Sequence, residues 1–113
     1  MKYVSYVTYT KDKARIAAHR PAHREYLSGL PEQGKLVACG PFPDDSGALF
    51  VYEVDCAEAA AAIVAQDPFF ANGVFESREL KPWTLVFSNA ELLRSGESPR
   101  CLPTARCRVR LKQ

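Results

Sequence analysis

The chain has 113 residues, enough for one domain with a modest hydrophobic core but too few for two. Hydrophobic residues make up 47% of it and charged residues 25%, which is ordinary usage for a globular protein. The net charge of +2 divides into +4 on residues 88–113 and −2 on residues 1–87, so the body of the protein is not a basic nucleic-acid binder.

The first predicted elements are a strand and a helix. Residues 3–9, YVSYVTY, are rich in valine and tyrosine and predict a strand. A polar connection over residues 10–19 leads into a helix that covers residues 21–32. Pro21 is expected to start this helix or to kink it, and Gly34 is expected to stop it.

A hairpin is predicted next. Residues 35–42 and 48–54 predict two strands, and the turn cluster PDDSG at residues 43–47 joins them. The aspartates of this cluster are expected to be turn residues only. Cys39, in the apolar run LVACG, is expected to be a small buried residue.

The last elements are a helix and a strand. An alanine-rich helix is predicted over residues 56–66 with Asp55 as its cap, followed by a break with a short turn at residues 67–73. A fourth strand is predicted over residues 74–87, with an interruption expected at Pro82.

The predicted order β-α-β-β-α-β is that of a ferredoxin-like α+β sandwich with a four-stranded antiparallel sheet. Both helices then cover one face of the sheet. The opposite face is also apolar, since alternation in the first and third strands divides Tyr3, Val7 and Tyr9 from Val4 and Tyr6, and Leu49 and Val51 from Phe50, Tyr52 and Val54. We expect a homodimer with its sheets packed together. A ligand-lined sheet in a monomer is the alternative.

Two cationic-capable side chains stand in the apolar stripe of the first helix. Residues spaced three or four apart lie on one face of a helix, and this spacing holds for Ile16, Arg20, His23, Leu27 and Leu30. A core stripe favours aliphatic residues, so the arginine and the histidine indicate a pocket wall.

The motifs RPAHREYL, GKLVACGPF, AQDPFFANGVFE and KPW follow one another within residues 2–87. In this order they resemble the YCII-related (YciI-like) family, which implies a ferredoxin-like domain that dimerises into an α+β barrel. The resemblance implies an active-site pair at His23 and Asp67. It also implies proton chemistry on small cyclic compounds, because activities of the family and of related barrels include a dehydrochlorinase, muconolactone isomerases and cofactor-free monooxygenases.

His23 is expected to act as general base and acid, since histidine titrates near neutral pH. In a helix that starts at Pro21, it would lie in the first turn, where the helix dipole favours the neutral ring. Asp67 is expected to orient this ring with one oxygen while its other oxygen caps the turn at Pro68. The alternatives are a buried core histidine satisfied by backbone, and an aspartate that only caps.

Four more residues are predicted to bind substrate. Arg20 is either an anion clamp for a carboxylate or phenolate or a solvated cation. Tyr26 either lines the pocket as a donor or packs. Gly40 and Pro41 are expected to shape the strand end beside the site.

No metal or cofactor is expected. His19 and His23 are spaced like a metal-binding pair, but Pro21 lies between them and no spaced carboxylate completes the set. The four cysteines form no CxxC motif. Because no apolar run is long enough for a membrane helix and MKYVSYVTYT is not a signal peptide, we expect a cytoplasmic protein with reduced thiols.

Residues 88–113 are predicted to be a basic C-terminal extension of the domain formed by residues 1–87. Their serine, proline and arginine content predicts an extended segment. The run RCRVRLK at residues 106–112 alternates cations with apolar residues and is suited to add a strand to a sheet edge or to a partner. Nucleic-acid or membrane binding is disfavoured, because the cluster is short and has no aromatic residue for base stacking.

The sequence therefore predicts a small cofactor-free enzyme that moves protons on a small phenolic or lactone-type ring, by elimination, isomerisation or dehydrohalogenation. One alternative is a non-catalytic module that binds a small molecule or a partner. Another is a cofactor-free oxygenase-like activity on the same barrel.

Overall fold

The computed structural model describes residues 1–94. Its elements are β1 (Lys2–Tyr9), α1 (Lys13–Ser28), β2 (Leu36–Pro41), β3 (Gly47–Glu53), α2 (Ala57–Ala65), α3 (Pro68–Ala71), β4 (Phe75–Trp83) and the 3-10 helix η1 (Ala90–Leu93). The predicted β-α-β-β-α-β order is confirmed, with α3 in place of the predicted short turn. The strand suggested for residues 106–112 lies outside the described residues.

The sheet has four antiparallel strands in the order β2-β3-β1-β4. In the register, Tyr3 of β1 lies opposite Tyr52 of β3 on one side and Pro82 of β4 on the other. Pro82 does not interrupt β4, because an edge strand needs no outward N–H for a neighbour. The strand ends at Trp83, earlier than the predicted residue 87.

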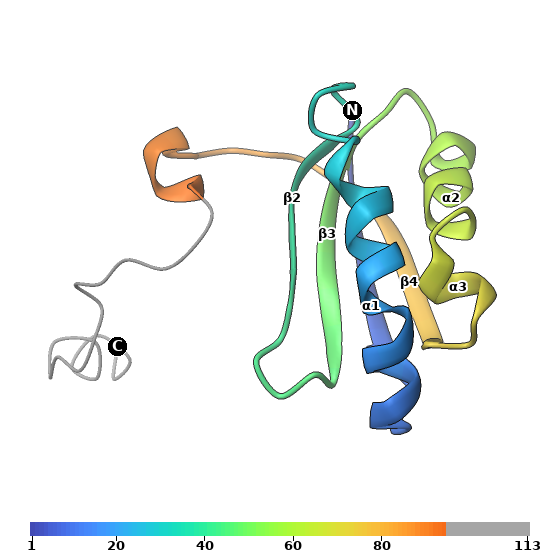
Figure 1. Cartoon of the computed structure of the whole chain (residues 1–113). Helices are drawn as coiled ribbons and strands as arrows, with labels where there is room; N and C mark the ends of the chain where they lie inside the picture. The colour runs from blue at the N-terminus through green and yellow to red at the C-terminus, as the bar shows by residue number, and fades with distance from the viewer. Residues whose placement is uncertain (95–113) are drawn as a thin grey trace, which may run out of the picture.

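All three α-helices lie on one face of the sheet, and η1 is set apart from them (Figure 1). The helix-facing side chains of β1 and β3 form the core, among them Tyr3, Val7, Phe50 and Tyr52. The alternating residues of the same strands face away from the helices, and Tyr6 and Leu49 are exposed there. Apolar side chains therefore occupy both faces, but only one face is covered in the described chain.

Helix α1 begins well before the predicted start. The Asp12 carboxylate accepts the Arg15 N–H at 3.1 Å and caps the N-terminus. Pro21 lies inside the helix on its exposed side, so the Ala17 carbonyl that proline leaves without a partner is open to hydration. The prediction of a helix start at Pro21 is wrong, and Gly29 rather than Gly34 follows the helix end.

The predicted cap of α2 also needs a correction. Cys56, not Asp55, is the N-cap residue, and its side chain makes no capping hydrogen bond. The predicted helix is otherwise present, with Ala60, Ile63 and Val64 buried. Aspartate has the stronger intrinsic preference for a cap, but the helix begins one residue too late to use it.

Candidate active site

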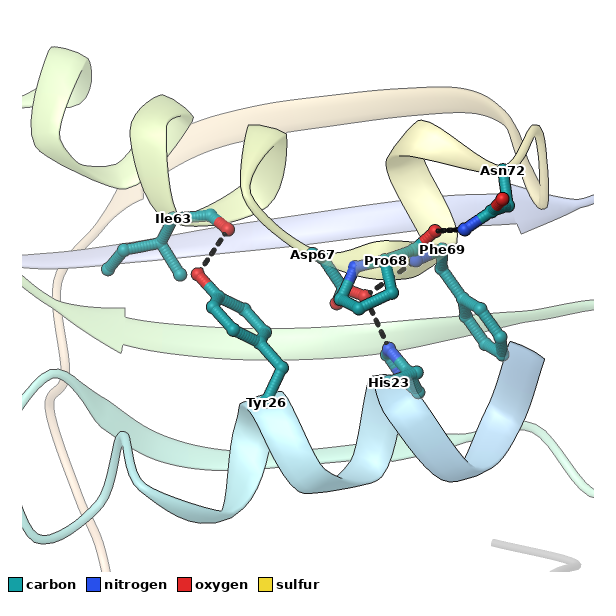
Figure 2. Close-up of polar contacts among 7 residues, drawn as sticks. All are labelled: His23, Tyr26, Ile63, Asp67, Pro68, Phe69 and Asn72. Carbon is teal, nitrogen blue, oxygen red and sulfur yellow. Dashed lines mark hydrogen bonds and ion pairs between the residues drawn. The ribbon is translucent and has the colours of Figure 1, made fainter.

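A buried hydrogen bond joins α1 to the start of α3. His23 Nδ1 lies 2.7 Å from Asp67 Oδ1, and the two residues are 5% and 2% exposed (Figure 2). The same Oδ1 accepts the Phe69 backbone N–H at 2.9 Å, so Asp67 is also the N-cap of α3. The two predicted residues are therefore brought together, but one carboxylate oxygen makes both bonds instead of one oxygen for each.

The hydrogen bond to Asp67 determines which ring nitrogen of His23 is available. A carboxylate accepts, so Nδ1 carries the proton and Nε2 of the neutral ring is an acceptor. No described residue hydrogen-bonds Nε2, and no sealed side-chain nitrogen or oxygen within residues 1–94 lacks a partner. His23 also lines a cavity, so Nε2 is the ring nitrogen left for a ligand bound there.

The position of His23 in α1 differs from the predicted one. His23 lies well inside the helix rather than in its first turn, so the helix dipole does not act on it as expected. Aromatic rings hold the imidazole instead. It stacks on Phe69 at a centroid distance of 3.8 Å and an interplanar angle of 7°, and Phe50 and Phe75 meet it edge to face.

A cavity of about 360 Å³ adjoins this pair on the helix side of the sheet. This volume is near the lower end of the range for small-molecule sites. The residues that line it come from β1, α1, β2, β3 and the turn after α1: Tyr9, Arg20, His23, Arg24, Leu27, Ser28, Pro31, Leu36, Cys39, Gly40, Pro41, Ala48 and Phe50. The cavity thus combines an aliphatic and aromatic wall with two arginines and a histidine.

Arg20 lies in the cavity wall and is held from outside it. Its Nη2 donates to Asp45 Oδ1 at 2.9 Å. Asp45, in the β2–β3 turn, has a left-handed backbone with φ of 59°. It was expected to be a turn residue only, whereas it also positions Arg20. Since a guanidinium has five N–H donors, Arg20 keeps donors for an anion in the cavity.

The remaining predicted residues divide into two groups. Gly40 and Pro41, at the end of β2, line the cavity. Tyr26 is not among the lining residues, and its hydroxyl donates to the Ile63 carbonyl oxygen at 2.7 Å (Figure 2). Tyr26 therefore joins α1 to α2, which corrects its prediction as a substrate-binding residue.

The lining residues that were not predicted include Arg24 and two with a titratable side chain of raised pKa, Tyr9 and Cys39. Tyr9 is only 3% exposed, and burial raises the pKa of its phenol to about 12. Cys39 is exposed, which contradicts the expectation of a buried thiol. The cavity wall still shields its sulfur, and this partial burial raises the thiol pKa. The only sequence signal for Tyr9 was a polar-tipped aromatic residue at the end of a core-facing strand.

Residues 1–94 hold no group of three or more histidine, cysteine, aspartate or glutamate side chains placed to bind a metal ion. His19 and His23 are therefore not part of such a group. Nor does any described helix have the length and hydropathy needed to cross a membrane.

These features define a class of protein: a ferredoxin-like α+β domain with a buried histidine–carboxylate pair beside a small cavity. The chain belongs to the YCII-related domain family, whose model matches residues 1–84. The family predicted from the motifs is thus confirmed.

Related sequences support the same assignment. Protein YciI of Escherichia coli O6:H1 is 36% identical over 96 residues, which cover 73% of this chain and 98% of that protein. Uncharacterized protein YjpA of Bacillus subtilis is 39% identical over 67 residues, which cover 59% of this chain and 78% of that protein.

Two solved structures share the fold. One is 5-chloro-2-hydroxyhydroquinone dehydrochlorinase (TftG) of Burkholderia phenoliruptrix AC1100, in complex with 2,5-dihydroxybenzoquinone. It matches with a TM-score of 0.67 and 22% sequence identity, and the match covers 74% of this chain and 94% of that chain. A muconolactone isomerase matches with a TM-score of 0.59 and 17% identity over 87% of this chain and all of that one, 100%. At these identities the likeness establishes the fold, and the predicted α+β fold class is confirmed.

Proposed function

We propose that this protein is a small cofactor-free enzyme that transfers protons on a single-ring phenolic or lactone-type compound, by elimination, isomerisation or dehydrohalogenation. The observation that carries the proposal is the 2.7 Å contact between His23 Nδ1 and Asp67 Oδ1 beside a cavity that His23 lines. A base oriented by a carboxylate and facing a small cavity is the arrangement that general acid–base catalysis requires.

In the proposed mechanism, His23 Nε2 takes a proton from a carbon of the bound ring. The electron pair of the broken C–H bond forms a double bond, and the imidazolium is stabilised by Asp67. In an elimination the leaving group departs with its own bonding pair. In an isomerisation His23 returns the proton to another atom of the ring. Arg20 binds an anionic oxygen of the substrate.

The proposed substrate class follows from the size and lining of the cavity. A volume of about 360 Å³ suits a compound of one ring, and the wall of leucine, proline and phenylalanine side chains suits an apolar ring. Arg20 and Arg24 add positive charge at the same cavity, which suits a phenolate or carboxylate. The two enzymes that share the fold act on small oxygenated rings, which agrees with this class.

The proposal is tested with a panel of single-ring phenols and lactones that includes 5-chloro-2-hydroxyhydroquinone and muconolactone, the compounds of the two structural neighbours. Product formation is followed by chromatography for the unaltered protein and for His23→Ala. We expect turnover of a panel member by the unaltered protein and its loss in the folded variant. Full activity of the His23→Ala variant would contradict the proposed mechanism.

The burial of the histidine–carboxylate pair also favours a second candidate, a non-catalytic module that binds a small molecule. At 5% and 2% exposure, His23 and Asp67 equally suit a structural link between α1 and α3. The two candidates are separated by recording the ring-proton NMR signals of His23 with each panel compound and then analysing the mixture for product. A ligand-dependent signal change without any product supports the binding module.

We further propose that the open face of the sheet pairs with a second copy of this chain. This face carries a hollow of about 560 Å³ among the side chains of Val4, Tyr6, Leu49, Val51, Glu79, Lys81, Pro82 and Trp83. Beyond β4, Val86 and Phe87 are also largely exposed. A self-complementary apolar face of this kind is suited to a two-fold dimer.

Analytical ultracentrifugation tests the dimer. We expect a dimer for the unaltered protein and a monomer for Leu49→Glu, which places a charge on the open face. Lys11→Glu, at an exposed position before α1, is the control and is expected to remain dimeric. A monomeric unaltered protein at micromolar concentration contradicts the proposal.

A further inference from the structure

The hydroxyl of Tyr9 has no role in the mechanism described so far. The Tyr9 ring is fixed in the core, edge to face with Phe69 at 5.4 Å and stacked near Phe75 at 6.2 Å. No described residue hydrogen-bonds its hydroxyl. Tyr9 is one of the residues that line the cavity beside His23 and Asp67, so its hydroxyl is available to a ligand bound there.

One cation lies among the charged groups around this hydroxyl. Arg20, Asp45, Asp67 and Cys39 are the charged or titratable groups that act on Tyr9, and among them the guanidinium of Arg20 acts most strongly. Arg20 is itself fixed by its ion pair with Asp45 at 2.9 Å. Burial keeps the phenol protonated at physiological pH, so Tyr9 is available there as a donor. A rigid neutral donor and a rigid cation therefore line the same cavity.

We propose that Tyr9 is a substrate-binding residue that donates a hydrogen bond to an anionic oxygen of the ligand, with Arg20 as the second ligand of that oxygen. The ligand class is then a single-ring phenolate or enolate. The inference rests on the proposed function for the identity of the cavity as the substrate site. It goes beyond that function by assigning the ligand oxygen to two named groups.

This arrangement has a chemical consequence. When His23 removes a proton from a carbon next to a C=O group, the electron pair of the C–H bond forms a C=C bond and the π pair of the C=O bond moves onto the oxygen. Fixed donors stabilise the negative charge that develops there. Tyr9 and Arg20 would thus bind a phenolate ligand and stabilise the enolate-like transition state of a carbonyl tautomer through the same contacts.

The test uses binding of a chromophore and does not depend on turnover. The probe is 4-nitrophenol, whose phenolate form absorbs visible light whereas its phenol form does not. Spectral titration gives the affinity of the full chain for each form and the midpoint at which the bound probe ionises. We expect the unaltered protein to prefer the phenolate and to lower that midpoint.

Tyr9→Phe keeps the ring packing and removes only the donor. A hydrogen bond to a charged group contributes about 1.5–3 kcal/mol, so we expect phenolate affinity to fall about tenfold to a hundredfold and the ionisation midpoint to rise. Affinity for the methyl ether, 4-nitroanisole, is expected to change little. Tyr26→Phe is the matched control: it loses a hydroxyl that bonds Ile63 outside the cavity and should keep the phenolate affinity of the unaltered protein.

Equal phenolate affinity of Tyr9→Phe and the unaltered protein would overturn the assignment, as would the absence of phenolate binding by the unaltered protein. If Tyr9→Phe does not fold, the unaltered protein still provides a test. The ζ-carbon NMR resonance of Tyr9 should shift on addition of the nitrophenolate while that of Tyr26 does not, and an unmoved Tyr9 signal contradicts the proposal. Phenolate binding without turnover of any panel compound would retain the role of Tyr9 and reject the proposed reaction.

Discussion

Asp67 caps a helix and also holds a buried histidine, so its removal should cost more than the loss of a cap. In Asp67→Ala the Phe69 N–H loses its acceptor, which costs about 1 kcal/mol for a typical N-cap. The Nδ1–H of His23 is left buried without a partner, which costs about 1–3 kcal/mol more. The free energy of unfolding should therefore fall by about 2–4 kcal/mol in total.

Urea unfolding, followed by circular dichroism, measures this loss. Asp12→Ala is the matched control, because Asp12 also caps a helix but is exposed and binds no buried side chain. Its loss should be about 1 kcal/mol. A double-mutant cycle isolates the pair: in a His23→Ala background, Asp67→Ala should cost only the cap, so the coupling energy is about 1–3 kcal/mol. Additive losses from the two single variants would refute the reasoning.

Three further outcomes are expected. Hydrogen bonds from the N-terminal amine and from Lys2 lower the pKa of Glu53 to about 2. The ionised Glu53 side chain therefore stabilises the fold above its unfolded pKa, and this stabilisation is lost as the pH falls toward 2. In Glu53→Gln, urea midpoints across this pH range should depend less on acid than those of the unaltered protein. Gly47→Ala places a Cβ against a backbone carbonyl of β1 and should lower the free energy of unfolding by at least about 1–3 kcal/mol. Gly40→Ala is the control: its Cβ meets no atom within 4 Å and should change the free energy of unfolding by less than about 0.5 kcal/mol. Near-equal urea midpoints for the two variants would refute this. At neutral pH iodoacetamide should modify Cys39 more slowly than Cys56, because the thiol pKa of Cys39 is raised. A ligand bound in the cavity should protect Cys39 from modification but not Cys56. Peptide mass spectrometry that shows protection of both thiols, or of neither, would contradict the assigned site.

The strands could be predicted because their patterns are local. Alternation in β1 and β3 separated Tyr3 from Tyr6 and Phe50 from Leu49, and the observed burial shows the same division. Which of the two faces the helices cover became clear only in the structure. The start of α1 could not be predicted in the same way. Residues 10–19 were predicted to be a polar connection and Pro21 the helix start or a kink, but a proline on the exposed side of a helix is tolerated once a cap, here Asp12, and packing determine where the helix begins.

The site was predictable where a residue conflicted with its surroundings. His23 stood out because it interrupts an apolar stripe, and Asp67 because its motif accompanies that of His23 along the chain. Tyr9 conflicted with nothing, since a tyrosine suits a core-facing strand position. Whether its hydroxyl is sealed or reaches a cavity depends on how α1 packs over β1, and that is a tertiary property. The pairing of Arg20 with Asp45 likewise depends on how the β2–β3 turn places a single carboxylate.

The central claim is that His23 moves a proton to and from carbon. It is tested most directly by incubating the panel compounds with the protein in deuterium oxide and following each ring C–H by NMR. The unaltered protein should introduce deuterium at the reacting carbon of its substrate, or into the product, and folded His23→Ala should do so no faster than buffer. Equal incorporation by both proteins would contradict the account.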